Sequence, residues 1–326
     1  MKSKVLITGG SGYIGSVISA YLLDNGYAVA VVDDLSTGNK EAIDKRAAFH
    51  SGSILDKSFL IEVLNGIDTV IHCAAKSLVE ESFASSQLYS QVNTDGTNTL
   101  LNAMTQSGVN KVIFSSTAAV YGDVNDNPLL ENSKINPINP YGESKYEAEQ
   151  LVAEFAKKGN AAVTFRYFNV AGSYKSDNGE LLVENHQNET HLIPKIIKNS
   201  LRNDVDSKVE IYGNNFPTED GTCIRDYLHI QDLAHAHLLA IKKLEIGESK
   251  VFNLGSGIGY SVLEVLDEIE SVIGVKLNRV ISPARKGDPA VLLAAIGKAK
   301  DQLGWKPEAS LSEIISSSWQ GMKQLG

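Results

Sequence analysis

A glycine-rich turn near the start of the chain limits what it can fold into. An apolar, β-branched run at 5–8 leads into Gly-Gly-Ser-Gly-Tyr-Ile-Gly at 9–15, and apolar residues at helical spacing follow. This order predicts a strand, a tight turn and a helix. Glycines at Gly9, Gly12 and Gly15 allow the turn, a close approach of backbone to a pyrophosphate, and close packing of helix against strand. The sequence therefore predicts a nucleotide-binding α/β unit.

The next expected strand ends in two acidic residues that favour one type of nucleotide. Residues 28–32 are apolar and lead into Asp33 and Asp34, about 20 residues after the turn, as a dinucleotide site requires. A carboxylate there accepts hydrogen bonds from adenine ribose hydroxyls and repels a 2′-phosphate, so NAD is favoured over NADP. The glycine spacing is G-x-x-G-x-x-G and not the commoner G-x-G-x-x-G, so the prediction depends on this strand and its acids.

The rest of the amino-terminal half alternates strands with helices. We expect further strands at 48–51, 69–73, 111–115 and 162–166, and helices at 88–107 and from 141 to about 158. This alternation predicts a doubly wound parallel sheet. Ligands of such sheets bind at the carboxyl ends of the strands, where the loops after these strands fall.

The alternation of predicted strands and helices ends after residue 172. We expect residues 173–192 to form an irregular, polar loop that faces the substrate. Further on, we expect helices at 194–201, 232–244, 262–273 and 311–322, extended segments at 210–212, 251–254 and 280–282, and a polar loop at 214–225. We predict an NAD-binding domain over 1–172, joined again by a segment near 226–258. A smaller α/β domain over 173–326 would mainly bind the substrate.

Composition excludes several classes of partner. The chain has 326 residues and a net charge of −9, which disfavours nucleic acid and anionic membranes as partners. Cys73 and Cys223 are the two cysteines, so no disulfide framework is implied and a reducing cytosol is expected. The chain starts without a leader-like segment and has no apolar run of the ~18–20 residues that cross a bilayer. We therefore expect a cytoplasmic protein with no membrane partner.

A tyrosine and a lysine four residues apart form the candidate catalytic pair. Pro140 suits the first position of a helix and Asn139 its cap, which places Tyr141 in the first turn. Lys145 projects from the same face, within about 5–6 Å by Cβ. A free tyrosine has a pKa of about 10, and the helix terminus and the ammonium are predicted to lower it. The Y-x-x-x-K spacing alone is common by chance, so the remaining chain must support it.

The glycine turn, the Ser115-Ser116-Thr117 run after the fifth strand, and the Tyr141 and Lys145 pair together resemble the extended short-chain dehydrogenase/reductase family. Downstream segments resemble the UDP-glucose 4-epimerases of that family in particular. These segments are Arg-Tyr-Phe-Asn at 166–169, Glu-Thr-His-Leu-Ile-Pro at 189–194, the run at 217–229, Asn-Leu-Gly-Ser-Gly at 253–257 and Arg-Lys-Gly-Asp at 285–288. The resemblance spans almost the whole chain.

The resemblance implies a Rossmann-type fold and interconversion of UDP-glucose and UDP-galactose. C4 would be inverted through a transient 4-keto sugar, with bound NAD as a recycled hydride carrier. Tyr141 would take the proton of the 4-hydroxyl, and Lys145 would hold the nicotinamide ribose and keep the phenolate available. Thr117 would hydrogen-bond the same sugar oxygen and could relay the proton.

The resemblance also implies which residues bind the two ligands. The cofactor positions are Gly9, Gly12, Tyr13, Ile14, Gly15, Asp33, Asp34, Leu35, Ser36, Thr37, Gly38, Ser53, Ile54, Cys73, Ala74, Ala75, Lys76, Asn93, Ser115, Tyr141, Lys145, Tyr167 and Phe168. The substrate positions are Thr117, Tyr141, Asn169, Leu192, Tyr212, Arg225, Arg285, Asp288 and Leu292. The two arginines suit a diphosphate, since guanidinium makes forked contacts with phosphate.

Three positions depart from the family pattern. Ser53 stands where many members have an aspartate near the adenine, and Ser77 where a cofactor-contacting lysine is common, with Lys76 next to it. Leu292 falls where space for the sugar 2-substituent is set. No metal site is expected, because His235 and His237 are two apart on a helix and cannot share a face.

Other functions remain open on the sequence. An epimerase of another UDP-sugar (a uronate, a pentose or an N-acetylhexosamine) is the main alternative, and a non-catalytic NAD-binding regulator is a second. A 4,6-dehydratase is disfavoured, since Ala118 and Ala119 stand where those enzymes typically carry an acid pair. The helices at 88–107 and from 141 resemble the pair that forms a four-helix dimer interface in this family, so we expect a homodimer.

Overall fold

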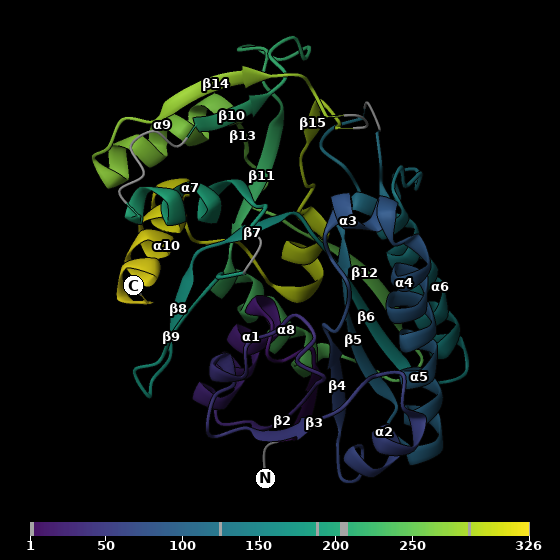
Figure 1. Ribbon diagram of the computed structural model, residues 1–326. Helices are drawn as coiled ribbons and strands as arrows, with labels where there is room; N and C mark the ends of the chain where they lie inside the picture. The colour runs from purple at the N-terminus through teal and green to yellow at the C-terminus, as the bar shows by residue number, and fades with distance from the viewer. Residues whose placement is uncertain (1–2, 124–125, 187–188, 203–207, 286–287, 326) are drawn as a thin grey trace.

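The computed structural model describes residues 3–123, 126–186, 189–202, 208–285 and 288–325. A central parallel sheet lies between layers of helices (Figure 1). Within the described residues it has seven strands, in the order β12-β6-β5-β4-β1-β2-β3. The strands are β1 (Lys4–Thr8), β2 (Ala28–Asp33), β3 (Ala48–Ser51), β4 (Thr69–His72), β5 (Lys111–Thr117), β6 (Ala161–Tyr167) and β12 (Ser249–Leu254). The predicted doubly wound Rossmann-type sheet is confirmed.

Helices cover both faces of this sheet. One face carries α1 (Tyr13–Asp24) and α8 (Ile230–Lys243), whose apolar residues share a buried cluster with β1 and β6. The other carries α2 (Lys57–Val63), α5 (Gly96–Ser107) and α6 (Pro140–Lys157). Because both faces are covered, the central strands are apolar runs without alternation.

The helix predicted at 88–107 is longer and less regular than expected. It consists of α4 (Ser86–Tyr89), a wider π-type turn η2 (Ser90–Asp95) and α5. The short α3 (Val79–Ala84) precedes it. A π-type turn in a helix often accompanies a functional site, and η2 carries Asn93, one of the predicted cofactor positions.

A second, smaller group of elements packs beside the carboxyl ends of the central strands (Figure 1). Its four-stranded sheet contains β7 (Asn169–Ala171), β11 (Ile224–His229), β13 (Gly259–Ser261) and β15 (Val291–Leu292). A two-stranded parallel sheet pairs β10 (Lys208–Tyr212) with β14 (Asn278–Ser282). Helices α7 (Leu192–Leu201), α9 (Val262–Ile273) and α10 (Leu311–Leu325) bury their apolar faces together here. The chain returns to the main sheet as β12, beside β6.

Two predictions about loops were wrong. The segment expected to be irregular after residue 172 begins with a hairpin of β8 (Ser173–Lys175) and β9 (Leu181–Val183), which packs against α10. The predicted polar loop ends two residues early, because β11 begins at Ile224 and pairs in parallel with β7 and β15. Such short strands depend on distant partners and leave little periodicity in the sequence.

The remaining short helical turns are η1 (Lys40–Ala42), η3 (Ala118–Val120) and η4 (Ala299–Leu303). In the part of the chain that the structure describes, no helix has the length and apolarity needed to cross a membrane.

Candidate active site

A cavity of about 1270 Å³ lies over the carboxyl ends of the central strands. Its walls come from the glycine turn after β1, from Asp33 at the end of β2, and from the loop after β4. Thr117 and Tyr167, the last residues of β5 and β6, complete this side and are paired in the sheet register. Parallel strands thus bring distant segments to one edge.

The glycine turn has no room for side chains at two of its positions. A Cβ on Gly9, where φ is +73°, would lie 2.6 Å from the backbone nitrogen of Ala74. A Cβ on Gly15 would lie 2.2 Å from the carbonyl oxygen of Gly9. The turn therefore packs directly against the loop after β4, and α1 begins at Tyr13 with no side-chain cap on its first N–H groups. Such a helix end is suited to bind an anion.

The acid at the end of β2 shapes the turn from the other side. The Asp33 carboxylate accepts hydrogen bonds from the backbone N–H of Ser11 at 3.0 Å and of Leu35 at 2.9 Å. Ser11 Oγ is buried and has no hydrogen-bond partner among the described residues. Free backbone donors, an orphaned hydroxyl and a carboxylate beside them fit the pyrophosphate and adenosine ribose of NAD.

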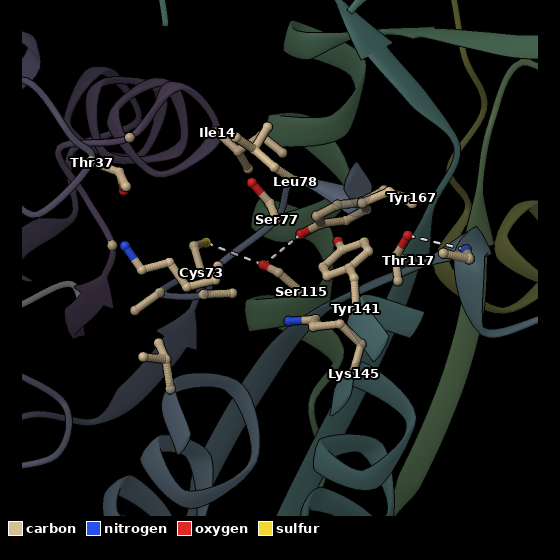
Figure 2. A pocket seen from close by; sticks show the side chains of 18 of the residues that line it. Ile14, Thr37, Cys73, Ser77, Leu78, Ser115, Thr117, Tyr141, Lys145 and Tyr167 are labelled. Atoms are coloured by element: carbon tan, nitrogen blue, oxygen red, sulfur yellow. Dashed lines mark hydrogen bonds between the residues drawn. The ribbon is translucent and has the colours of Figure 1, made fainter. Parts of the chain in front are cut away.

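The candidate catalytic side chains lie together on the wall formed by β5 and α6. Asn139 caps α6, since its Oδ1 accepts from the Gly142 N–H at 2.8 Å, and Pro140 is the first helical residue, as predicted. Figure 2 shows Tyr141 between Lys145 and Thr117. All three line the cavity.

The pKa of Tyr141 moves opposite to the prediction. Burial raises it above the usual value of a tyrosine, and a hydrogen bond with Thr117 offsets part of that rise. Lys145 is buried, with Nζ 4.2 Å from the ring centroid of Phe114. Burial lowers the pKa of Lys145 to about 8, against the charges of Cys73 and Glu149, which raise it. For Tyr141, the loss of solvent therefore raises the pKa by more than the helix terminus and the Lys145 ammonium were predicted to lower it.

A chain of buried hydroxyl and thiol groups continues from this wall. Tyr167 Oη donates to Ser115 Oγ at 2.8 Å, and Ser115 Oγ lies 3.2 Å from Cys73 Sγ (Figure 2). Burial raises the pKa of Cys73 to about 11, so the thiol stays neutral. His237, which lies 2.7 Å from Tyr167 Oη, is also kept neutral, because burial lowers its pKa to about 4.

A buried ionic network holds α6 behind the catalytic wall. The Glu149 carboxylate accepts from Ser116 Oγ at 2.5 Å and from Arg166 Nη2 at 2.7 Å. Arg166 Nη1 donates to Tyr121 Oη at 3.0 Å, and Tyr121 Oη donates to Asn253 Oδ1 at 2.6 Å. Arg166 and Asn253, both part of the sequence motifs, thus join α6 to β5, β6 and β12.

One predicted cofactor position acts from behind the cavity wall. Asn93 is buried and does not line the cavity in the described structure. Its amide accepts from the Lys76 N–H at 2.8 Å and donates to the Lys76 carbonyl at 3.0 Å and to Ser144 Oγ at 2.9 Å. It fixes the loop after β4 against α6.

The opposite wall contains the predicted substrate residues of the second group. Arg225 on β11 pairs with the Asp288 carboxylate and donates to the Pro289 carbonyl at 2.8 Å. Leu292 on β15 lies beside Arg225 in the sheet register. Arg285 stacks on Tyr212, with its guanidinium carbon 3.9 Å from the ring centroid. Lys286 and Gly287, between the two charged residues of the predicted motif, lie outside the described residues.

Two predicted substrate residues are not brought to the cavity. Neither Leu192 nor Tyr212 lines it in the described part of the chain. Leu192 begins α7 and is half-buried against the core of the second group, whereas Tyr212 stacks on Arg285, which itself lines the cavity. All other predicted cofactor and substrate positions except Asn93 line the cavity, Ser53 and Asn169 included.

Sequence reasoning missed two further parts of the lining. One is the stretch from Leu78 to Val92, which contributes Phe83, Leu88 and Gln91. The other lies between β9 and α7, where Glu184, His186 and His191 face the cavity. The second had a visible signal, since glutamate and histidine alternate as E-x-H-x-x-E-x-H at 184–191.

The two histidines of this segment lie among carboxylates. Hydrogen bonds with Glu184 and Glu189 raise the pKa of His186 to about 9. Burial alone would lower the pKa of His191, but the charges and hydrogen bonds of Glu184 and Glu189 together outweigh burial and raise the pKa to about 10. For comparison, His235 lies away from this segment, with Nδ1 3.1 Å from Tyr21 Oη.

Comparisons with known proteins find relatives along nearly the whole chain. Residues 5–255 match the model of the NAD dependent epimerase/dehydratase family. The UDP-glucose 4-epimerase of Corynebacterium glutamicum is 42% identical over 99% of this chain and 97% of that protein. The solved structure of UDP-glucose 4-epimerase from Bifidobacterium longum, in complex with NAD+ and UDP, is 34% identical with a TM-score of 0.92, over 99% of this chain and 98% of that one. The UDP-Glc/GlcNAc 4-epimerase of Campylobacter jejuni is 36% identical with a TM-score of 0.84, over 99% of each chain.

Proposed function

Because the chain belongs to the NAD dependent epimerase/dehydratase family, we propose that it interconverts UDP-glucose and UDP-galactose by inverting C4 of the hexose. The observation that carries this proposal is a cavity shared by two sets of residues. Its volume of about 1270 Å³ exceeds the ~300–1,000 Å³ of an ordinary small-molecule pocket, which leaves room for a dinucleotide and a nucleotide sugar together.

The cofactor would be held by the glycine turn and the ends of the central strands. The pyrophosphate would lie on the free N–H groups at the start of α1, and Asp33 would accept from the adenosine ribose. Lys76 and Lys145 both line the cavity, and Lys145 would donate to the hydroxyls of the nicotinamide ribose. When bound, NAD supplies the acceptor and donor of the C4 hydride.

Tyr141, Thr117 and Lys145 would handle the proton of the sugar 4-hydroxyl. Tyr141 would accept this proton from O4 and later return it to O4, once the 4-keto sugar has turned its other face toward the hydride donor. The raised pKa of the tyrosine suits the returning step, because its neutral hydroxyl is a proton donor. Thr117 would hold the sugar oxygen in line with Tyr141, and the cationic form of Lys145 would favour the phenolate in the first step.

The nucleotide sugar would lie along the opposite wall. Arg225 and Arg285 are the guanidinium groups that face the cavity there, and each suits a diphosphate. Asp288 would accept from a ribose hydroxyl of the uridine, with Arg225 holding its carboxylate. Asn169 and Leu292 would face the diphosphate and the sugar.

We also propose the division of labour expected from the sequence. Residues 1–172, joined by the segment near 226–258, would bind NAD, and 173–326 would mainly bind the sugar nucleotide. The pairing of β12 with β6 supports the crossing segment. We propose a cytoplasmic location from the acidic composition and the two free cysteines, Cys73 and Cys223.

We further propose a homodimer through the helix pair that includes α5 and α6, which pack against each other along the outer face of the main sheet. Light scattering of the purified protein should give twice the chain mass of 35.2 kDa. A species of one chain mass at micromolar concentration would contradict the dimer.

Incubation of purified protein with UDP-galactose tests the proposed activity. UDP-hexoses are separated after reaction with and without added NAD+. Formation of UDP-glucose supports the proposal, and formation without added cofactor shows that NAD is retained. No conversion under either condition, with UDP-uronates and UDP-pentoses converted instead, would reassign the substrate.

A further inference from the structure

Four side chains between β9 and α7 bring their donor atoms together. We call them the 184–191 cluster: Glu184, His186, Glu189 and His191. One ligand atom from each lies within 4.8 Å of all the others. Three of the four residues line the cavity, and Glu184 is buried. The proposed reaction gives no role to any of the four side chains.

The spacing of these atoms matches a tetrahedral metal sphere. With metal–ligand distances of about 2.0–2.1 Å, tetrahedral donors lie about 3.3 Å apart. His186 Nδ1 lies 3.3 Å from Glu184 Oε1 and 3.2 Å from Glu189 Oε2. His191 Nδ1 lies 3.5 Å from Glu189 Oε1 and 2.6 Å from Glu184 Oε1. Both imidazoles therefore present Nδ1 to both carboxylates. Three of the four separations lie near the tetrahedral value, and the fourth, between His191 and Glu184 Oε1, is a hydrogen bond that an ion would replace.

A second observation is an unused acceptor at this position. Glu184 Oε2 is buried and has no hydrogen-bond partner among the described residues. A buried carboxylate oxygen without a partner is costly, and native proteins usually satisfy such groups. The ion-pair network uses only Oε1 of Glu184 and leaves Oε2 unsatisfied, whereas a cation bound to Glu184 through Oε2 would satisfy it.

We propose that the 184–191 cluster binds a divalent transition-metal ion of the zinc class. Imidazole nitrogen and carboxylate oxygen together favour zinc over magnesium or calcium, which prefer oxygen ligands alone. Four protein donors fill a tetrahedral sphere and leave no open position, so the ion is structural and not catalytic. It fixes the segment between β9 and α7, which forms part of the cavity wall.

Metal binding by the protein without a tag tests the proposal directly. The protein is treated with a chelator, dialysed, and titrated with Zn²⁺ against a coloured indicator. The proposal expects about one zinc ion per chain, with affinity lower by about 100-fold or more in His186→Ala and Glu189→Gln, since even outer-shell changes cost 10–100-fold. His235→Ala is the matched control and should bind as the unchanged protein does.

Cobalt provides a readout that does not depend on a variant's fold. Co²⁺ added to the unchanged protein should give the intense visible bands of tetrahedral coordination, and Zn²⁺ should remove them. Zn²⁺, but not Mg²⁺, should also raise the melting temperature of the unchanged protein. Zinc binding equal in the unchanged protein and in Glu189→Gln, or only the weak bands of octahedral Co²⁺, would overturn the proposal and leave an ion-pair network.

Discussion

The two walls of the cavity are built in different ways. On the cofactor side, each contributing loop directly follows its own strand, and parallel strands bring all the loops to one edge. On the substrate side, Arg225 comes from the middle of a second sheet, and Asp288 reaches it from more than 60 positions along the chain. The first wall follows from local sequence, whereas the second depends on tertiary pairing. Substitutions in the cofactor wall should therefore affect cofactor retention, whereas substitutions in the substrate wall should affect substrate affinity.

Removal of the Tyr141 hydroxyl should have the largest effect, because this group would both accept and return the proton of the sugar 4-hydroxyl. We expect Tyr141→Phe to lower kcat by about 10²–10⁴-fold, the usual contribution of a positioned acid or base. Bound NAD should be retained, since the phenyl ring remains. Steady-state kinetics with UDP-galactose measure the change.

Tyr146→Phe, on the same helix but outside the described cavity lining, is the control and should change kcat little. Equal losses in the two variants would contradict the role of Tyr141.

Arg225 tests the substrate wall alone. Its side chain is 11% exposed, against 44% for Arg285. Loss of a hydrogen bond to a charged group costs about 1.5–3 kcal/mol, so Arg225→Gln should raise KM by about 10–100-fold. Arg285→Gln should raise it less, because solvent screens the exposed group. Loss of bound NAD from either variant would contradict the assignment of these arginines to the substrate wall alone.

Asp33 tests the cofactor wall in the same manner. Asp33→Asn keeps the size of the side chain but removes the charge that accepts from two backbone N–H groups and would accept from the adenosine ribose. We expect NAD affinity to fall by about tenfold and discrimination against NADP to weaken, with KM for the sugar nucleotide unchanged once NAD is saturating. Fluorescence titration of the variant with NAD and with NADP measures both affinities. Asp34→Asn, which alters an exposed neighbour, should have the smaller effect.

The buried lysine predicts a smaller, pH-dependent effect on stability. The pKa of Lys145 is about 8 in the folded chain and about 10.4 when unfolded. Between these values the unfolded state binds more protons, so stability rises with pH, by up to about 1.4 kcal/mol per unit. Lys145→Met has no titrating group at this position, so its stability should not show this rise with pH.

Urea unfolding from pH 7.5 to 9.5 should therefore show that the free energy of unfolding of the unchanged protein rises relative to that of Lys145→Met as pH rises. A constant or opposite difference would mean that the lysine is not desolvated.

The cofactor wall could be predicted from sequence because its signals are local. Gly9, Gly15 and Asp33 each occupy a position set by the strand before them, and Asn139 and Pro140 define the start of α6 without reference to distant residues. Asn93 shows the limit of such reasoning. It belongs to this region, but the structure shows it holding the Lys76 backbone and not facing the cavity.

The remaining features depend on burial and on contacts that local sequence does not contain. The direction of the Tyr141 pKa follows from its desolvation, which no four-residue spacing reveals. Leu192 and Tyr212 were placed by resemblance alone, and in the structure the first is half-buried against a core and the second stacks on Arg285. The 184–191 cluster was readable as a pattern, but only the fold brings its four donors together.

The central claim is that one site removes the hydride from C4 and returns it to the same carbon. UDP-galactose carrying deuterium at C4 is converted in ordinary water, and the UDP-glucose product is examined by mass spectrometry and NMR. The proposed function predicts that deuterium stays at C4 of the product, because the bound cofactor carries it. Loss of the label to solvent would show that the carbon is deprotonated instead, and would contradict the proposed function.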